Sequence, residues 1–171
     1  MSNWFMLSLV GKDQPGIVAQ VTRALFENEA NLGEASMQRI GGHFAIMLML
    51  SSDHSQDELT NKIQTVADEL KLTMHMDPFD GELHQHVDAD VCVSLYGADR
   101  TGIVATATEK LAAAGLHILA LNTDVGGTVE DPIFVMEIEG RATQGIDILR
   151  ESVLDIADLE INITAIDTLL A

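Results

Sequence analysis

Residues 11–19 read GKDQPGIVA and residues 97–105 read GADRTGIVA, so one pattern occurs twice in this chain. Gly, Asp, Gly, Ile, Val and Ala keep the same places in both copies. An apolar run of strand length comes before each copy, WFMLSLV at 4–10 and VCVSLY at 91–96. Each copy therefore predicts a strand that enters a glycine turn, and a turn that opens a helix.

The start of such a helix attracts an anion such as a carboxylate, because its first N–H groups are free and its dipole end is positive. The second glycine of the pattern, Gly16 or Gly102, lets backbone approach closely without hindrance from a Cβ atom. Pro15 suits the first helical position, where a missing N–H is no loss. We expect Asp13 and Asp99 to cap their helices.

The remainder of each half also has a regular pattern. The pair Gly41-Gly42 lies between two β-like runs and predicts a hairpin. Ser55 and Glu58 have the spacing of a capping box at the start of a second helix, and Thr143 is expected to cap the corresponding helix of the other half. The order is β-α-β-β-α-β in both halves, which is the split βαβ, ferredoxin-like arrangement.

We therefore predict an α+β protein of two ferredoxin-like units, each an antiparallel sheet with its helices on one face. The first unit is expected at 1–79 and the second at 89–171, joined by an acidic linker at 80–88. A unit of this size buries a modest fraction of its surface, and an unpaired edge strand invites association. We expect a homodimer.

The composition argues against several classes of protein. With 27 acidic and 9 basic residues the net charge is −18, and without a Lys/Arg cluster we expect no direct nucleic-acid binding. The single cysteine, Cys92, permits no disulfide framework and is expected to pack within its strand. No signal peptide and no run of ~20 apolar residues occurs, so we expect a cytoplasmic protein without membrane contact. Without a nucleophile, P-loop or dinucleotide motif, we expect neither an enzyme nor a cofactor.

The duplicated βαββαβ pattern, with Asp-x-Pro-Gly-Ile-Val or Asp-x-Thr-Gly-Ile-Val at its first turn, resembles tandem ACT domains over residues 3–77 and 89–168. A two-ACT chain without a catalytic or DNA-binding domain is similar to the glycine cleavage system transcriptional repressor group. The resemblance implies regulation by a small ligand, usually an amino acid, with glycine as one candidate. It also implies contact with a DNA-binding activator protein.

The resemblance implies that the ligand lies where the first turn of one unit meets a neighbouring unit. Many ligand-binding members have an Asn that enters the second strand, and here Asn31 matches in the first unit while His117 takes that place in the second. The two ligand loops implied are Asp13, Gln14, Pro15, Gly16, Ile17 and Val18, and Asp99, Arg100, Thr101, Gly102, Ile103 and Val104.

The residues themselves suit an α-amino acid. The N–H groups near Gly16 and Ile17 can bind its carboxylate, Asn31 offers both a donor and an acceptor, and Asp13 can take the ammonium or cap its own helix. Arg100 is either a solvated loop cation or a second group that holds a carboxylate. Ligand binding would stabilise one arrangement of units and so change the surface that a partner meets.

Two other functions stay open from the sequence. The glycine turns could be vestigial, which would leave an acidic interaction module that recruits a basic partner. Alternatively, the alternating residues His84, His86, Asp88 and Asp90 could bind a metal in a small metal-dependent enzyme, although such residues in an acidic linker often have no role.

Overall fold

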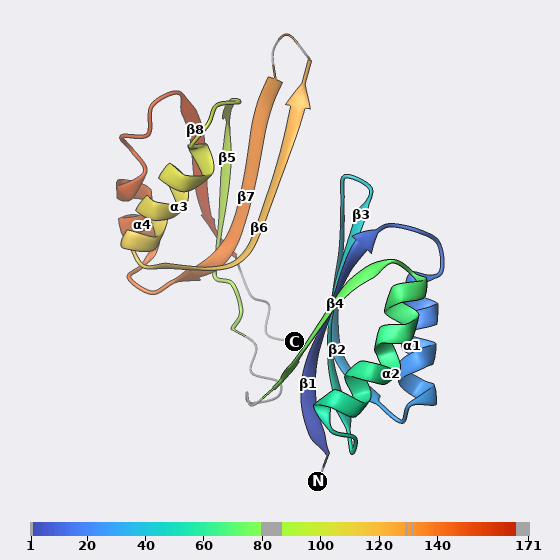
Figure 1. Cartoon of the computed structure of the whole chain (residues 1–171). Helices are drawn as coiled ribbons and strands as arrows, with labels where there is room; N and C mark the ends of the chain where they lie inside the picture. Colours follow the sequence, from blue (N-terminus) through green and yellow to red (C-terminus); the bar gives the residue numbers. More distant parts are fainter. Residues whose placement is uncertain (1, 80–86, 129, 131, 167–171) are drawn as a thin grey trace. The chain divides into compact units, whose positions relative to one another are not determined.

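The computed structural model describes residues 2–79, 87–128, 130 and 132–166. The chain divides into two compact units, Met1–Leu83 and His84–Ala171, each of which is described by itself (Figure 1). In the part of the chain that is described, no helix is long and apolar enough to cross a membrane.

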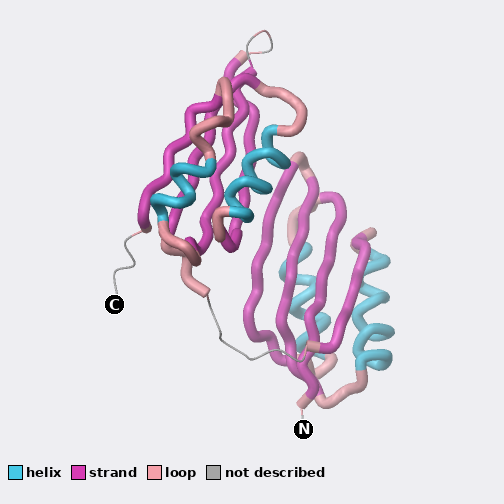
Figure 2. Tube along the Cα trace, turned by 90° about the vertical axis from the view of Figure 1, so that its left-hand side faces the viewer, coloured by secondary structure: helices cyan, strands magenta, loops and turns pink. Residues whose placement is uncertain are grey.

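The first unit is a four-stranded antiparallel sheet in the order β2-β3-β1-β4, with both helices on one side of it (Figure 2). Its elements are β1 (Asn3–Lys12), α1 (Ile17–Glu27), β2 (Asn31–Ile40), β3 (His43–Ser52), α2 (Gln56–Glu69) and β4 (Leu72–Pro78).

The second unit repeats this topology with the strand order β6-β7-β5-β8. The predicted pair of βαββαβ units is therefore confirmed. Its elements are β5 (Val91–Ala98), α3 (Ile103–Ala113), β6 (Leu116–Gly127), β7 (Pro132–Ala142), α4 (Ile146–Ser152) and β8 (Leu159–Ala165).

The core of each unit lies between its sheet and its helices. Phe5, Leu7 and Leu9 alternate along β1 and are buried beneath α1 and α2. The predicted hairpin between β2 and β3 is confirmed, and Gly41 and Gly42 have φ values of 55° and 77°, the left-handed backbone that such a two-residue turn needs. This short turn sets the register between β2 and β3.

The predicted capping box at α2 is also confirmed. The Glu58 N–H donates to the Ser55 hydroxyl oxygen, while the Ser55 N–H donates to the Glu58 carboxylate at 2.9 Å. Hydrogen bonds from the Ser55 backbone and hydroxyl lower the pKa of the Glu58 carboxyl below its usual value. The prediction for Thr143 is wrong: α4 begins after Gly145, and the Thr143 hydroxyl instead donates to the Gly115 carbonyl at 2.7 Å. That bond ties the end of β7 to the turn after α3.

Candidate functional site

The first glycine turn joins the end of β1 to the start of α1. Gly16 is the N-cap residue, with φ 88° and ψ 0°, values typical of the second central residue in a type II turn that has proline before it. A side chain at this φ would be strained, which explains the glycine. Within the described residues the N-cap makes no side-chain cap hydrogen bond, so the first N–H groups of α1 remain available to a ligand or water.

Three expectations about the two glycine turns are wrong. Asp13 and Asp99 do not cap their helices, because the N-cap residues are Gly16 and Gly102 in left-handed backbone. Pro15 belongs to the turn and precedes the N-cap residue, so that Ile17 is the first helical residue. Asp13 directly follows the last residue of β1, and its N–H donates to the Gly42 carbonyl at 3.0 Å.

Asp13 forms an ion pair with Arg39, near the end of β2. The Asp13 side chain is 21% exposed and the Arg39 side chain is 65% exposed, so the pair lies at the mouth of the turn, with its cation toward solvent. A neighbouring positive and negative group is the arrangement that a zwitterion can contact with both of its charges.

A pocket of about 730 Å³ opens at this turn and includes both members of the ion pair. All six residues predicted for the first ligand loop line it. Sequence reasoning missed four other lining residues, which are Ala19, Met37, Arg39 and Phe44. Ala19 follows the predicted loop directly in the repeated pattern, and the hairpin could have indicated Arg39 and Phe44, because the tight Gly41-Gly42 turn pairs these two residues.

Gln14 and Arg100 take matching places in the two units; Gln14 reaches the C-cap residue of α2, and Arg100 reaches the segment between α4 and β8. The Gln14 amide donates to the Leu70 carbonyl at 3.0 Å. The Arg100 guanidinium donates to the Ala157 carbonyl at 2.7 Å and lies 3.9 Å from the Asp158 carboxylate. In this structure the Arg100 guanidinium is therefore engaged with its own unit.

The second glycine turn differs from the first. Gly102 has the same backbone as Gly16, with φ 90°, but the Asp99 N–H lies 3.4 Å from the Pro132 carbonyl, a longer bond than at Asp13. Val125 pairs with Phe134 as Arg39 pairs with Phe44, so this unit has an apolar residue where the first has a guanidinium.

The pocket at the second turn is smaller, about 340 Å³, and it faces the segment between α4 and β8. Arg100, Thr101, Gly102 and Ile103 line it, whereas Asp99 and Val104 do not. Lys110 crosses it to Asp155 at 2.8 Å, and this hydrogen bond lowers the pKa of the Asp155 carboxyl. Lys110 and Asp155 therefore form an ion pair across this pocket, as Arg39 and Asp13 do at the first.

Asn31 and His117 lie far from the glycine turns of their own units. Asn31 begins β2 opposite Ser51, eight residues before Arg39, which is about 26 Å along a strand. His117 is opposite Arg141, close to the start of β6. Neither residue lines the pocket at the glycine turn of its own unit.

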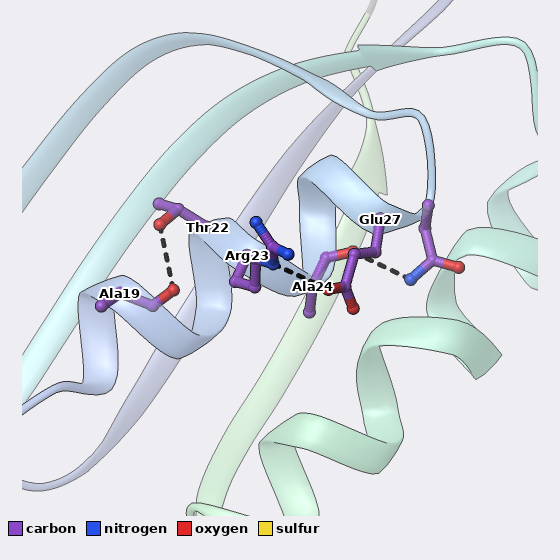
Figure 3. A network of polar contacts seen from close by, with 6 residues as sticks. Ala19, Thr22, Arg23, Ala24 and Glu27 are labelled. Atoms are coloured by element: carbon purple, nitrogen blue, oxygen red, sulfur yellow. Dashed lines mark hydrogen bonds and ion pairs between the residues drawn. The ribbon is translucent and has the colours of Figure 1, made fainter.

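Polar side chains of α1 form hydrogen bonds and an ion pair mainly with other residues of the same helix (Figure 3). The Thr22 hydroxyl donates to the Val18 carbonyl at 2.8 Å and lies 3.3 Å from that of Ala19. The Arg23 side chain is bound to Glu27 at 2.7 Å. The residues of α1 that line the pocket are those at its N-terminal end, Ile17, Val18 and Ala19.

The structure does not support a metal site where it describes the chain. His84 and His86 lie outside the described residues. Asp90 is engaged in structure, since its carboxylate accepts from the Ala142 N–H at 2.8 Å. Within the described ranges no group of three or more His, Cys, Asp or Glu side chains is placed to hold a metal ion. Cys92 is a partly buried strand residue, and burial raises the pKa of its thiol.

Comparison with known proteins gives relatives for a single unit. The family model for the ACT domain matches residues 3–77. A UPF0237 protein of Listeria innocua is 33% identical over 76 residues, which are 42% of this chain and 83% of that protein. The UPF0237 protein YjhC of Lactococcus lactis is 39% identical over 62 residues, 33% of this chain and 71% of that protein.

Among the solved structures that match both units, two have a TM-score near 0.7. A protein of unknown function from Galdieria sulphuraria has a TM-score of 0.73 at 20% identity, covering 97% of this chain and 99% of that one. A candidate glycine cleavage system transcriptional repressor has a TM-score of 0.69 at 16% identity, with the same coverage. At these identities the likeness concerns the fold alone, and it covers both units of the chain.

Proposed function

The chain belongs to the ACT-domain family, and from this premise we propose that it is a regulatory protein that binds a small amino acid at its first glycine turn. We further propose that it is a cytoplasmic homodimer without catalytic activity, which acts on transcription through contact with a DNA-binding protein. Glycine is one candidate for this ligand, as the resemblance to the glycine cleavage repressor group implies.

The observation that carries the proposal is the charge pattern around the first pocket. The N–H groups at the start of α1 and the exposed Arg39 guanidinium offer two places for a carboxylate. The Asp13 carboxylate offers a place for an ammonium group. An α-amino acid carries both charges a few ångströms apart, so it can replace the internal ion pair with two contacts of its own.

The net charge of −18 supports the other half of the proposal. A surface of this sign disfavours DNA and favours a partner protein with a basic face. Ligand binding would act on that partner by shifting the population between two arrangements of units. The same charge favours the second candidate function, a non-sensing acidic interaction module.

Thermal unfolding of the purified chain in the presence of each proteinogenic amino acid separates these two functions. A ligand that binds only the folded state at about 100 times its dissociation constant stabilises it by about 2.7 kcal/mol. We expect one small amino acid to raise the melting temperature. If none does so, the sensing role fails and the interaction module is the better description.

Two variants locate the site. Arg39→Val installs the residue that the second unit has at Val125, and we expect it to abolish the ligand-induced shift, whereas Arg141→Val, which removes one cation elsewhere, should keep it. Gly16→Val should also abolish binding, and Gly102→Val imposes the same backbone strain in the second unit as its control. Unchanged affinity in Arg39→Val or Gly16→Val would remove the first turn from the site.

A further inference from the structure

The sheet of the first unit has a second face, away from the helices, which we call the open face. Because side chains alternate along a strand, and Phe5, Leu7 and Leu9 face the helices, Trp4, Met6, Ser8 and Val10 face the other way. Register with the neighbouring strands adds three apolar residues to this face, which are Ala45, Met47 and Met49 of β3.

The central part of the open face, on β1 and β3, is mostly apolar and partly exposed, whereas β2 and β4 add polar residues at its sides, such as Ser36, Gln38 and Thr73. Met47 is 52% exposed and Val10 is 49% exposed. Met49 is only 8% exposed, although it is not part of the core beneath the helices. Methionine side chains are flexible and polarizable, so they adapt well to a second apolar surface.

The open face also has few charged groups. Across the rows from Trp4 to Val10, His75 stands beside Ser8 and Asp77 beside Met6, while Glu34 lies in the bulge of β2 opposite Met49. The His75 and Asp77 side chains bind each other at 2.9 Å. In a chain of net charge −18, such a face is one where two copies can meet without strong repulsion.

The corresponding face of the second unit has the opposite character. Glu137 pairs with Ser94 as Met47 pairs with Ser8, and Glu139 pairs with Cys92 as Met49 pairs with Met6. Glu160 stands beside Tyr96 on the same face. The fold therefore accepts glutamate at these positions, and the two methionines of the first unit are not a requirement of its folding.

We propose that two copies of the chain associate through the open face of the first unit, packed sheet against sheet about a two-fold axis. The face is self-complementary because apolar residues occupy its middle, as a two-fold interface requires. Three strands of ten residues and one of seven give a flat area of about 600 Å², and the accessible surface of its side chains is larger. That approaches the ~800 Å² per partner of a specific interface. The second unit's carboxylates disfavour the alternative pairing through its own sheet face.

This inference rests on the homodimer of the proposed function and assigns its surface, independently of any ligand. The test is the molar mass of the full chain by light scattering after size exclusion, in wild type and in Met47→Glu. We expect wild type at twice the 18.5 kDa of one chain. In Met47→Glu the dissociation constant should rise by about 100-fold or more, because each copy would bury an unpaired carboxylate.

The control is Asn162→Asp, which adds the same charge to the open side of the second sheet, beside Ser94. It should remain a dimer. Far-UV circular dichroism checks that Met47→Glu is folded, as Glu137 at the equivalent place leads us to expect. A monomeric wild type, a dimeric Met47→Glu or a monomeric Asn162→Asp would each overturn the proposal.

Trp4 supplies a second measurement without any variant. It is the single tryptophan of the chain and lies on the open face, so its emission should shift to the red as the wild type dissociates on dilution. A dimer whose Trp4 emission does not change on dissociation would contradict the assigned surface while leaving the homodimer itself intact. Loss of ligand-induced stabilisation, measured separately, would affect only the sensing role.

Discussion

Gly97→Ala adds one methyl group to the second unit, and we expect it to destabilise that unit while leaving the first unit unchanged. Gly97 opens the second copy of the repeated turn, in β5, and pairs with Leu159 of β8. A Cβ atom added here would contact the Leu159 side chain and would lie 2.8 Å from the Asp158 carbonyl oxygen. This carbonyl belongs to the backbone just before β8, so it cannot move aside as the end of a flexible side chain can.

The expected cost of Gly97→Ala follows from these distances. Forcing an extra carbon into packed structure costs about 1–3 kcal/mol, and the lower entropy of the unfolded alanine chain returns about 0.4–1 kcal/mol. A net loss of about 1–2 kcal/mol corresponds to about 5–15 °C in the melting temperature of a unit of this size.

The assay uses Trp4, because the single tryptophan reports on the first unit while far-UV circular dichroism reports on both. Gly97→Ala should lower the dichroism transition of the second unit and leave the Trp4 transition in place. Gly126→Ala is the matched control, since an added Cβ there meets no described atom within 4 Å. Unchanged melting of Gly97→Ala would refute the steric argument, and an equal shift of the Trp4 transition would refute independent unfolding of the units.

Two further predictions concern helices. Ser55→Ala should destabilise the first unit by about 0.5–2 kcal/mol in urea unfolding, because it removes the cap of α2, whereas a loss within error would show that the cap is dispensable. Because folding lowers the pKa of Glu58, its carboxylate adds to the free energy of unfolding above its ordinary pKa, and this addition declines as the pH falls through the lowered value. A free energy of unfolding that does not change in acid would contradict this. Leu149→Ala should cost about 2–5 kcal/mol, measured by the dichroism transition of the second unit, since Leu149 is the fully buried anchor of α4, and Ile148→Ala at an exposed position is its control.

Much of the site can be predicted from the sequence because its main element is local. The glycine turn is one continuous stretch, so its six residues line the first pocket together. The error at Asp13 has a physical reason. An aspartate before a helix has two uses for its carboxylate, and here the ion pair with Arg39 prevails over capping. Arg39 comes from another strand, so no pattern within the turn indicates it.

The sequence alone determined the two βαββαβ units, since the alternation of apolar residues, the glycine turns and the capping box are properties of neighbouring residues. Only the tertiary structure decided which groups meet at each turn and which residues occupy the open face. Those depend on strand register, which sets Arg39 beside Asp13 in one unit and Val125 in the corresponding place of the other. Register is a relation between strands far apart in the chain, and a shift of one residue would turn every side chain of a strand to the opposite face.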